Sequence, residues 1–254
     1  MPGNDGDGGF ASHVLVPSRG LCAIPEPLPQ GLTLDMLSVV ADAVTTPFEA
    51  IRRSCLGPDD VAVIVGVGGV GGFGVQIAAA RGAAVVAIDV DRERLELVAR
   101  HGAGLALDAS ATDLKGLKAA VRTFIKESAR TGIGLKIFEM SGTPVGQTTA
   151  FGLLDHGAYL AVVGFTPKPV ELRLSNLMAF DATARGNWGC PPDQYPAALR
   201  LVLEGKISLA PFIEFHPLEE APAILEAVAN HSIRRRVILQ PQHGQISQSS
   251  EAIR

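Results

Sequence analysis

The stretch Val61-Ala-Val-Ile-Val-Gly-Val-Gly-Gly-Val-Gly71 decides the fold of this chain. An apolar run typical of a buried strand passes directly into a Gly-x-Gly-Gly-x-Gly turn, and the next residues have a helical pattern. Gly66 permits the tight turn, Gly68 leaves room for a pyrophosphate, and Gly71 lets the helix pack close to the sheet. Free N–H groups at the helix start favour an anion. The stretch therefore predicts a dinucleotide-binding loop whose cofactor contacts are Gly66, Gly68, Gly69, Val70 and Gly71.

The residues that follow this loop support the same interpretation. Residues 73–81 read as a helix, and residues 83–89 read as a second buried strand that ends in a carboxylate, Asp89. An acid about twenty residues after the glycine loop accepts hydrogen bonds from the adenosine ribose hydroxyls. A carboxylate there would repel a 2′-phosphate, so we expect NAD rather than NADP. In the alternative interpretation Asp89 caps the next helix, a role that Asp91 could fill equally well.

The composition limits the classes of partner. The chain has 254 residues, 47% of them hydrophobic, and a net charge of −4 without long Lys/Arg blocks, which argues against nucleic acid or an anionic membrane as the main partner. The N-terminus lacks the features of a signal peptide, and no apolar run reaches membrane-spanning length, so a cytoplasmic location is the default expectation. The three cysteines are far apart, which predicts neither a disulfide framework nor a cysteine-built zinc site.

Strand and helix patterns alternate along the rest of the chain. We expect strands at 105–108, 135–140, 158–164 and 184–189, and helices at 91–101, 114–130, 148–154 and 191–205. This alternation predicts an α/β fold, a doubly wound parallel sheet of the Rossmann type. Outside the sheet we expect a strand at 8–17, a helical pattern at 32–55, a helix at 218–230 and a strand at 237–239.

The chain resembles the medium-chain, zinc-type alcohol dehydrogenases from about Gly8 to Leu239. The resemblance is carried by GGFASHVLVP, VVADAVTTPFEAI, VIVGVGGVGG, AIDVDRERLELV, AVVGF and RLSNLMAF. It implies NAD-dependent oxidation of a secondary alcohol, with zinc polarising the alkoxide and the nicotinamide accepting the hydride. It also implies a small-molecule substrate and a homo-oligomer joined through the edges of the coenzyme sheets.

A narrower likeness is to dehydrogenases of alicyclic hydroxyacyl-CoA compounds in anaerobic aromatic degradation. It is carried by ADAVTTP, VVGFT, SNLMAF and GNWGC. In the family pattern, the zinc cysteine, the Gly-His-Glu segment and the four-cysteine zinc lobe would precede Gly8. We therefore expect that this chain is either a fragment of a longer enzyme or a short form, and that it is inactive in the family's zinc chemistry as it stands. For the same reason the catalytic residues stay unassigned.

The resemblance implies a division into four parts. Residues 1–40 would be a remnant of a GroES-like β catalytic domain, and residues 41–205 the NAD-binding Rossmann domain. Residues 206–239 would return to the catalytic domain. Residues 240–254 are polar without periodicity, and we expect them to be disordered.

The resemblance also assigns individual residues to the cofactor. Arg94 would lie near the adenosine ribose, or alternatively on a solvated face beside an acid such as Glu96. Thr46 matches the nicotinamide-side turn, or alternatively caps a helix that starts at Pro47. Of the basic triplet at 234–236, only one residue is expected at the cofactor, at the pyrophosphate. The complete list beyond the glycine loop is Thr46, Asp89, Arg94, Ser141, Val163, Gly164, Phe165 and Arg236.

The turns at Ser141–Gly142 and Val163–Phe165 would lie at the carboxyl edge of the sheet, where doubly wound folds bind ligands. Ordinary strand-end turns are the alternative there. Asp42 occupies the position of a zinc ligand in the family, although a catalytic zinc needs about three protein donors. In the alternative interpretation Asp42 is simply a polar residue on a helix turn. At the level of the whole chain, a non-catalytic NAD-binding or interaction module is the alternative to the dehydrogenase.

Overall fold

The computed structural model describes residues 3, 5–11, 13–128, 134–230 and 232–241. Its main body is a six-stranded sheet in the order β3-β2-β1-β4-β5-β6, with every pairing parallel. This order has the switch point of a Rossmann fold between β1 and β4, which confirms the predicted doubly wound sheet. The strands are β1 (Val61–Val65), β2 (Ala84–Asp89), β3 (Leu105–Asp108), β4 (Lys136–Glu139), β5 (Tyr159–Val162) and β6 (Thr183–Gly186).

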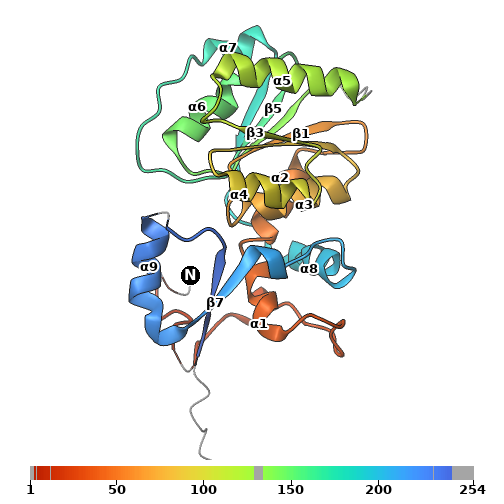
Figure 1. Cartoon of the computed structure of the whole chain (residues 1–254). Coiled ribbons are helices and arrows are strands. Elements are labelled where there is room, and N and C mark those ends of the chain that lie inside the picture. The colour runs from red at the N-terminus through yellow and green to blue at the C-terminus, as the bar shows by residue number, and fades with distance from the viewer. Residues whose placement is uncertain (1–2, 4, 12, 129–133, 231, 242–254) are drawn as a thin grey trace, which may run out of the picture.

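Helices cover both faces of this sheet (Figure 1). On one face they pack over strand residues such as Ala62, Ile64 and Phe138, and on the other over Val63 and Ile137, so alternate positions of each strand enter separate cores. The helices of the first face are α2 (Thr45–Arg53), α3 (Gly71–Ala80) and α4 (Arg92–Ala99). Those of the second face are α5 (Leu114–Glu127), α6 (Pro144–Gly152) and α7 (Ser175–Ala179).

A smaller body lies beside the first face (Figure 1). It contains a two-stranded parallel sheet of β7 (Ile213–Pro217) and β8 (Arg236–Gln240). Its helices are α1 (Leu34–Leu37), α8 (Tyr195–Leu203) and α9 (Ala221–Ala229). Short 3-10 turns are η1 (Ser18–Gly20), η2 (Ser38–Val40), η3 (Pro192–Gln194), η4 (Ala210–Phe212) and η5 (Leu218–Glu220).

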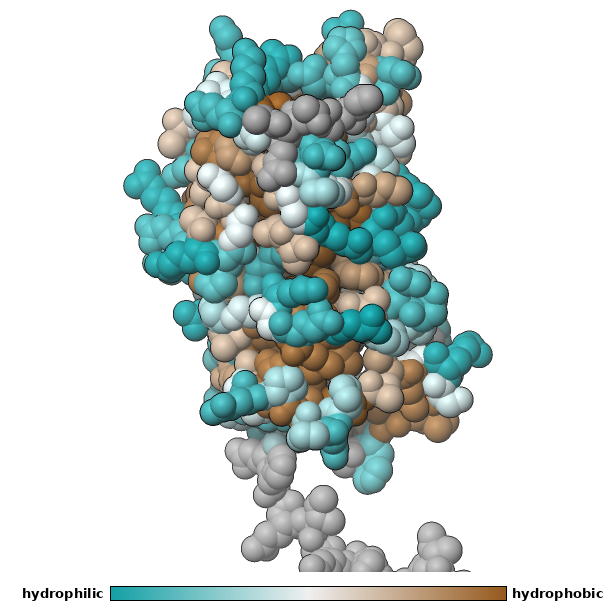
Figure 2. Space-filling model, turned by 90° about the vertical axis from the view of Figure 1, so that its right-hand side faces the viewer, coloured by the Kyte–Doolittle hydropathy of each residue, from teal (hydrophilic) through white to brown (hydrophobic). Residues whose placement is uncertain are grey.

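The smaller body joins the two ends of the described chain. The amide of Gln240 donates to the carboxylate of Asp35 at 2.7 Å, which ties β8 to α1. Because Gln240 is the last residue of β8, one position beyond the predicted segment, this contact supports the proposal that residues 1–40 and 206–239 belong to one domain, whose exact boundaries stay a prediction. Figure 2 shows hydrophobic side chains exposed in the lower half of one face of the molecule. In the smaller body Leu34, Phe215 and Leu225 are 63%, 43% and 55% exposed, so this body presents apolar surface to solvent.

Several elements differ from the prediction. The expected strand at 8–17 is wrong, because the described residues of that segment form no strand. A single extended segment without a neighbouring strand leaves its N–H and C=O groups unpaired, so alternation alone does not create a strand. β7 and α7 were not predicted, and α6 begins at Pro144 rather than at residue 148, with Thr143 as its cap. The disorder expected from residue 240 is wrong at Gln240, which ends β8 and pairs with β7; residues 242–254 of that tail lie outside the described residues. In the part of the chain that the structure describes, no helix is long and apolar enough to cross a membrane.

Candidate functional site

The glycine loop has the backbone that its sequence predicts. Gly66 has a φ of +85°, and a Cβ built on it would lie 2.5 Å from the Cα of Ser141. A Cβ on Gly71 would overlap the carbonyl oxygen of Gly66. The two positions therefore exclude any side chain for backbone reasons alone, because the loop folds back on the start of α3 and abuts the turn after β4.

Two arginines lie over the middle of the loop. The guanidinium of Arg94 is 3.5 Å from where a Cβ on Gly68 would be, and the side chain of Arg236 stands equally close to Gly69. Val70, the N-cap residue of α3, gives the helix no side-chain cap. The uncapped helix start and the guanidinium of Arg94 both favour an anion here, whereas the guanidinium of Arg236 is paired with Asp42. Arg94 Nε is buried without a hydrogen-bond partner, which fits a site completed by a ligand.

Asp89 is almost buried, and its carboxylate accepts three backbone N–H groups. Oδ2 accepts from Val67 of the glycine loop at 2.7 Å, and Oδ1 accepts from Val90 at 2.7 Å and Asp91 at 3.0 Å. The cap of α4 is Asp91, whose side chain accepts from the amides of residues 93 and 94. The alternative interpretation of Asp89 as the cap of this helix is therefore wrong. Asp89 holds the loop against the end of β2, and about one of the four acceptor sites of its carboxylate remains for a predicted ribose hydroxyl.

Asp42, Thr46 and Arg236 form one group at the start of α2. The hydroxyl of Thr46 donates to Asp42 Oδ1 at 3.0 Å, and Arg236 Nη2 donates to Asp42 Oδ2 at 2.8 Å. Val44 is the N-cap of α2, so Thr46 does not have the capping role considered above. Within the described residues, no three His, Cys, Asp or Glu side chains are grouped to hold a metal ion. Because Asp42 faces the guanidinium of Arg236 rather than further metal ligands, these residues do not fit a zinc ion.

The turns after β4 and β5 meet at the carboxyl edge of the sheet, as predicted. The amides of Val163 and Gly164 both donate to the carbonyl of Glu139, at 2.9 and 3.0 Å. Gln147 Nε2 donates to the carbonyl of Gly164 at 3.2 Å. Phe165 is 78% exposed, so its ring does not pack into the core. The edge therefore presents backbone groups and one exposed ring next to the glycine loop.

Glu139 is the residue of this site that the sequence interpretation missed. It ends β4 and is fully buried. Its Oε1 accepts from Ser141 N at 2.8 Å, Ser141 Oγ at 2.5 Å and Gly142 N at 3.2 Å. Burial raises the pKa of this carboxyl, against the opposing effect of the donors of Ser141, Gly142 and Gly164. An acid at the last position of an otherwise apolar central strand, directly before Ser-Gly, is the signal that could have identified it.

The raised pKa of Glu139 predicts a pH dependence of stability. A carboxyl whose pKa is higher in the folded chain contributes most below its ordinary value of 4.5, and this contribution is lost as the pH rises through the folded-state pKa. The unfolding free energy of the chain minus that of Glu139→Gln should therefore fall from about pH 4.5 upward and then level off. Urea unfolding of both proteins across this range measures it. A difference that rises with pH would contradict the assignment.

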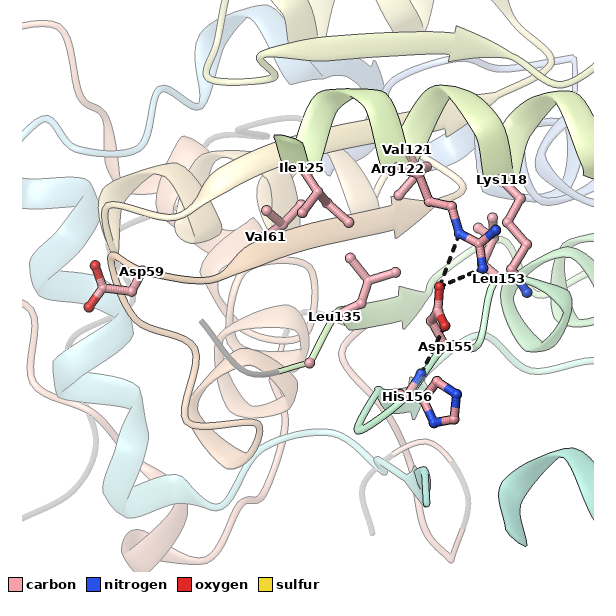
Figure 3. A pocket seen from close by; sticks show the side chains of 11 residues that line it. Asp59, Val61, Lys118, Val121, Arg122, Ile125, Leu135, Leu153, Asp155 and His156 are labelled. Atoms are coloured by element: carbon pink, nitrogen blue, oxygen red, sulfur yellow. Dashed lines mark hydrogen bonds and ion pairs between the residues drawn. The ribbon is translucent and has the colours of Figure 1, made fainter. Parts of the chain in front are cut away.

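A cavity of about 180 Å³ lies at the opposite, amino edge of the sheet, between α5 and the segments before β1, β4 and β5 (Figure 3). Three of its charged side chains, those of Lys118, Arg122 and Asp155, already have partners. Arg122 donates to Asp155 at 2.9 Å, and Lys118 donates to the carbonyl of Leu154 at 2.8 Å. The groups over the glycine loop lie at the other edge, so we place the candidate site there and not in this cavity.

Comparison with known proteins identifies the family of the chain. The family model of the zinc-binding dehydrogenases matches residues 69–204. An alcohol dehydrogenase of Geobacillus stearothermophilus is 24% identical over 241 residues, which cover 92% of this chain and 65% of that protein. The chain therefore spans about two thirds of the length of this curated relative.

Solved structures show the same fold. The alcohol dehydrogenase of the archaeon Aeropyrum pernix is 25% identical and superposes with a TM-score of 0.81, over 95% of this chain and 67% of that one. The acetophenone reductase of Geotrichum candidum, solved in complex with NAD, is 21% identical with a TM-score of 0.69, over 84% of this chain and 57% of that one. The family model covers more than half of the chain, beginning within the glycine loop at Gly69, so the chain belongs to the family of zinc-binding dehydrogenases, the medium-chain, zinc-type alcohol dehydrogenases.

Proposed function

We propose that the chain binds NAD over the glycine loop and that it serves the NAD-dependent oxidation of a secondary alcohol. The observation that carries the proposal is the position of Asp89, whose carboxylate holds Val67 of the loop at 2.7 Å at the end of β2. An acid there is placed for the adenosine ribose of a dinucleotide. Bound NAD would supply the hydride acceptor.

Each part of the cofactor would contact a different group of residues. Arg94 would lie near the adenosine ribose, and Arg236 would lie near the pyrophosphate at the uncapped start of α3, where the helix dipole favours an anion. The turns at Ser141–Gly142 and Val163–Phe165 would receive the nicotinamide. Thr46 would lie on the same side, oriented by its hydrogen bond to Asp42.

The surroundings of Asp89 favour NAD over NADP. Arg92 is paired with Asp108 at 3.0 Å, and Arg234 is paired with Asp91 at 2.8 Å. A 2′-phosphate would therefore meet the charge of Asp89, while the guanidinium groups of Arg92 and Arg234 already have acidic partners. Hydrogen bonds to a charged group contribute about 1.5–3 kcal/mol each, so we expect a preference of about tenfold or more for NADH.

The finer parts of the proposal concern substrate and assembly. The relatives named above are an alcohol dehydrogenase and a ketone reductase by name, which supports a small-molecule alcohol as substrate. Sequence likeness alone suggests an alicyclic hydroxyacyl-CoA, as in 6-hydroxycyclohex-1-ene-1-carbonyl-CoA dehydrogenase. The edge strand β6 is exposed at every position, which suits a homo-oligomer joined at this edge. A cytoplasmic location stays a prediction.

Titration of the purified chain with NADH and NADPH tests the cofactor proposal. We expect saturable binding of NADH, measured by calorimetry, and affinity for NADPH lower by about tenfold or more. Equal affinities would contradict the role of Asp89, and no binding of either would contradict the site itself.

Turnover is tested separately with NAD and a panel of secondary alcohols, including alicyclic hydroxyacyl-CoA esters, by the appearance of NADH. A non-catalytic binding module predicts the same NADH affinity without turnover.

A further inference from the structure

The carboxyl group of Glu139 is buried, and no cationic side chain among the described residues pairs with it. Its Oε1 accepts three hydrogen bonds from the turn that follows β4, whereas Oε2 is buried with no partner in the described part of the chain. Burying a carboxyl group costs free energy that an apolar residue at this position would avoid. Stabilisation of the hydrophobic core therefore does not explain why an acidic residue occupies this position.

Three turns are in direct backbone contact around this carboxyl group. A Cβ on Gly142 would lie 2.8 Å from the carbonyl oxygen of Phe165, and a Cβ on Gly164 would lie equally close to Glu139 Oε2 and closer still to the amide of Gly142. The same turn after β4 abuts Gly66 of the glycine loop. The loop after β1 and the turns after β4 and β5 thus form one stack of backbone, with the side chain of Glu139 between the second and third layers.

The position of this stack relative to Asp89 distinguishes the two halves of a dinucleotide. Asp89 ends β2, on one side of the switch point between β1 and β4, and would hold the adenosine half. Glu139 ends β4, on the other side, where the nicotinamide half would lie. A side chain that controls only the turns after β4 and β5 should therefore affect one half of the cofactor and leave the other half unaffected.

We propose that Glu139 is a positioning residue that sets the spacing of the Ser141–Gly142 and Gly164–Phe165 turns for the nicotinamide half of NAD, without contacting the cofactor itself. This inference rests on the proposed function of the site. Oε1 fixes the turn after β4 by accepting hydrogen bonds from its three donors in Ser141 and Gly142. Oε2 limits how closely the backbone of Gly164 can approach the side chain of Glu139. An apolar residue would fill the volume but would leave those donors without an acceptor.

The test compares the dissociation constants of NADH and of ADP-ribose, which lacks the nicotinamide, by calorimetry. In Glu139→Leu, NADH should bind about tenfold more weakly or worse, whereas the affinity for ADP-ribose should change by less than about twofold. Glu139→Gln should stay close to the unmodified chain, since a carboxamide oxygen can accept the same three donors. Ile137→Ala, two residues earlier on the same face of β4, is the matched control. It creates a buried cavity within β4 without removing an acceptor from the turns, and it should weaken the two ligands equally or not at all.

Glu139→Asp is the second variant, for the case that Glu139→Leu does not fold. It keeps the carboxyl group but withdraws it by one methylene from the turn, so the same selective loss for NADH is expected. If the ratio of the two dissociation constants in the folded variants is the same as in the unmodified chain, Glu139 has no positioning role and the inference is overturned. This holds whether both ligands bind more weakly or neither does. If the unmodified chain binds ADP-ribose and NADH with equal affinity, the proposed nicotinamide site fails, and the inference fails with it. That result is recognisable before any variant is made.

Discussion

Replacing Gly71 with alanine is expected to destabilise the fold and to weaken NADH binding together. In an unconstrained helix the substitution would stabilise by about 1 kcal/mol, because alanine is the better helix former. Here the new Cβ would overlap the carbonyl oxygen of Gly66, a backbone atom that no rotamer can move. Forced overpacking costs about 1–3 kcal/mol or more, so the clash outweighs the helix propensity. We expect a net loss of about 2 kcal/mol of unfolding free energy in urea, and a loss of NADH affinity of about tenfold or more.

Gly57→Ala is the control for this prediction. Gly57 precedes β1 at the amino edge of the sheet, and the nearest atom to a Cβ there is 3.9 Å away. Its unfolding free energy should change by less than about 0.5 kcal/mol and its NADH affinity should stay the same. A Gly71→Ala protein as stable as this control would mean that α3 does not approach the loop as closely as described.

Replacing Asp89 with alanine is expected to remove both the support of the loop and the preference for NADH. The amide of Val67 would be left buried without an acceptor, and those of Val90 and Asp91 would lose theirs in a partly buried setting. An unsatisfied buried donor costs about 1–3 kcal/mol, so we expect a loss of about 2–4 kcal/mol of unfolding free energy. NADH should bind about tenfold more weakly or worse, and the ratio of NADH to NADPH affinity should approach one.

Asp60→Ala is the matched control for Asp89→Ala. Asp60 also accepts a backbone N–H, that of Gly57 at 2.9 Å, but it lies before β1 at the amino edge. Its loss should cost about 1 kcal/mol and leave the affinities for both cofactors unchanged. If Asp89→Ala keeps the full preference for NADH, the carboxylate is only a structural acceptor and another group selects the cofactor.

Local patterns were sufficient to predict the sheet and its loop. An apolar run of strand length, a glycine turn and a helical pattern are features of neighbouring residues, and they repeat along the chain with little dependence on distant contacts. The same logic failed for the segment at 8–17 and for β7. A strand exists only where another strand pairs with it, and β7 pairs in parallel with β8, across α9. Periodicity does not report that pairing.

The partners of the candidate site residues could not be predicted in the same way. Arg236 was expected near the pyrophosphate, and it does lie over Gly69, but its ion pair with Asp42 joins residues 194 positions apart. That contact changes the interpretation of Asp42, which was considered as a zinc ligand and is found beside a guanidinium. Only the return of the chain through β8 brings the two side chains together.

The sequence by itself determined the parallel sheet, the glycine loop and the carboxylate at its second strand, because each follows from residues close together in the chain. The tertiary structure decided how these parts support one another. The carboxylate of Asp89 accepts hydrogen bonds from three backbone amides. The side chains of Arg94 and Arg236 both lie over the glycine loop, and that of Glu139 is buried between two turns. These relations depend on strand order and register, which place the carboxyl ends of β1, β2, β4 and β5 at one edge.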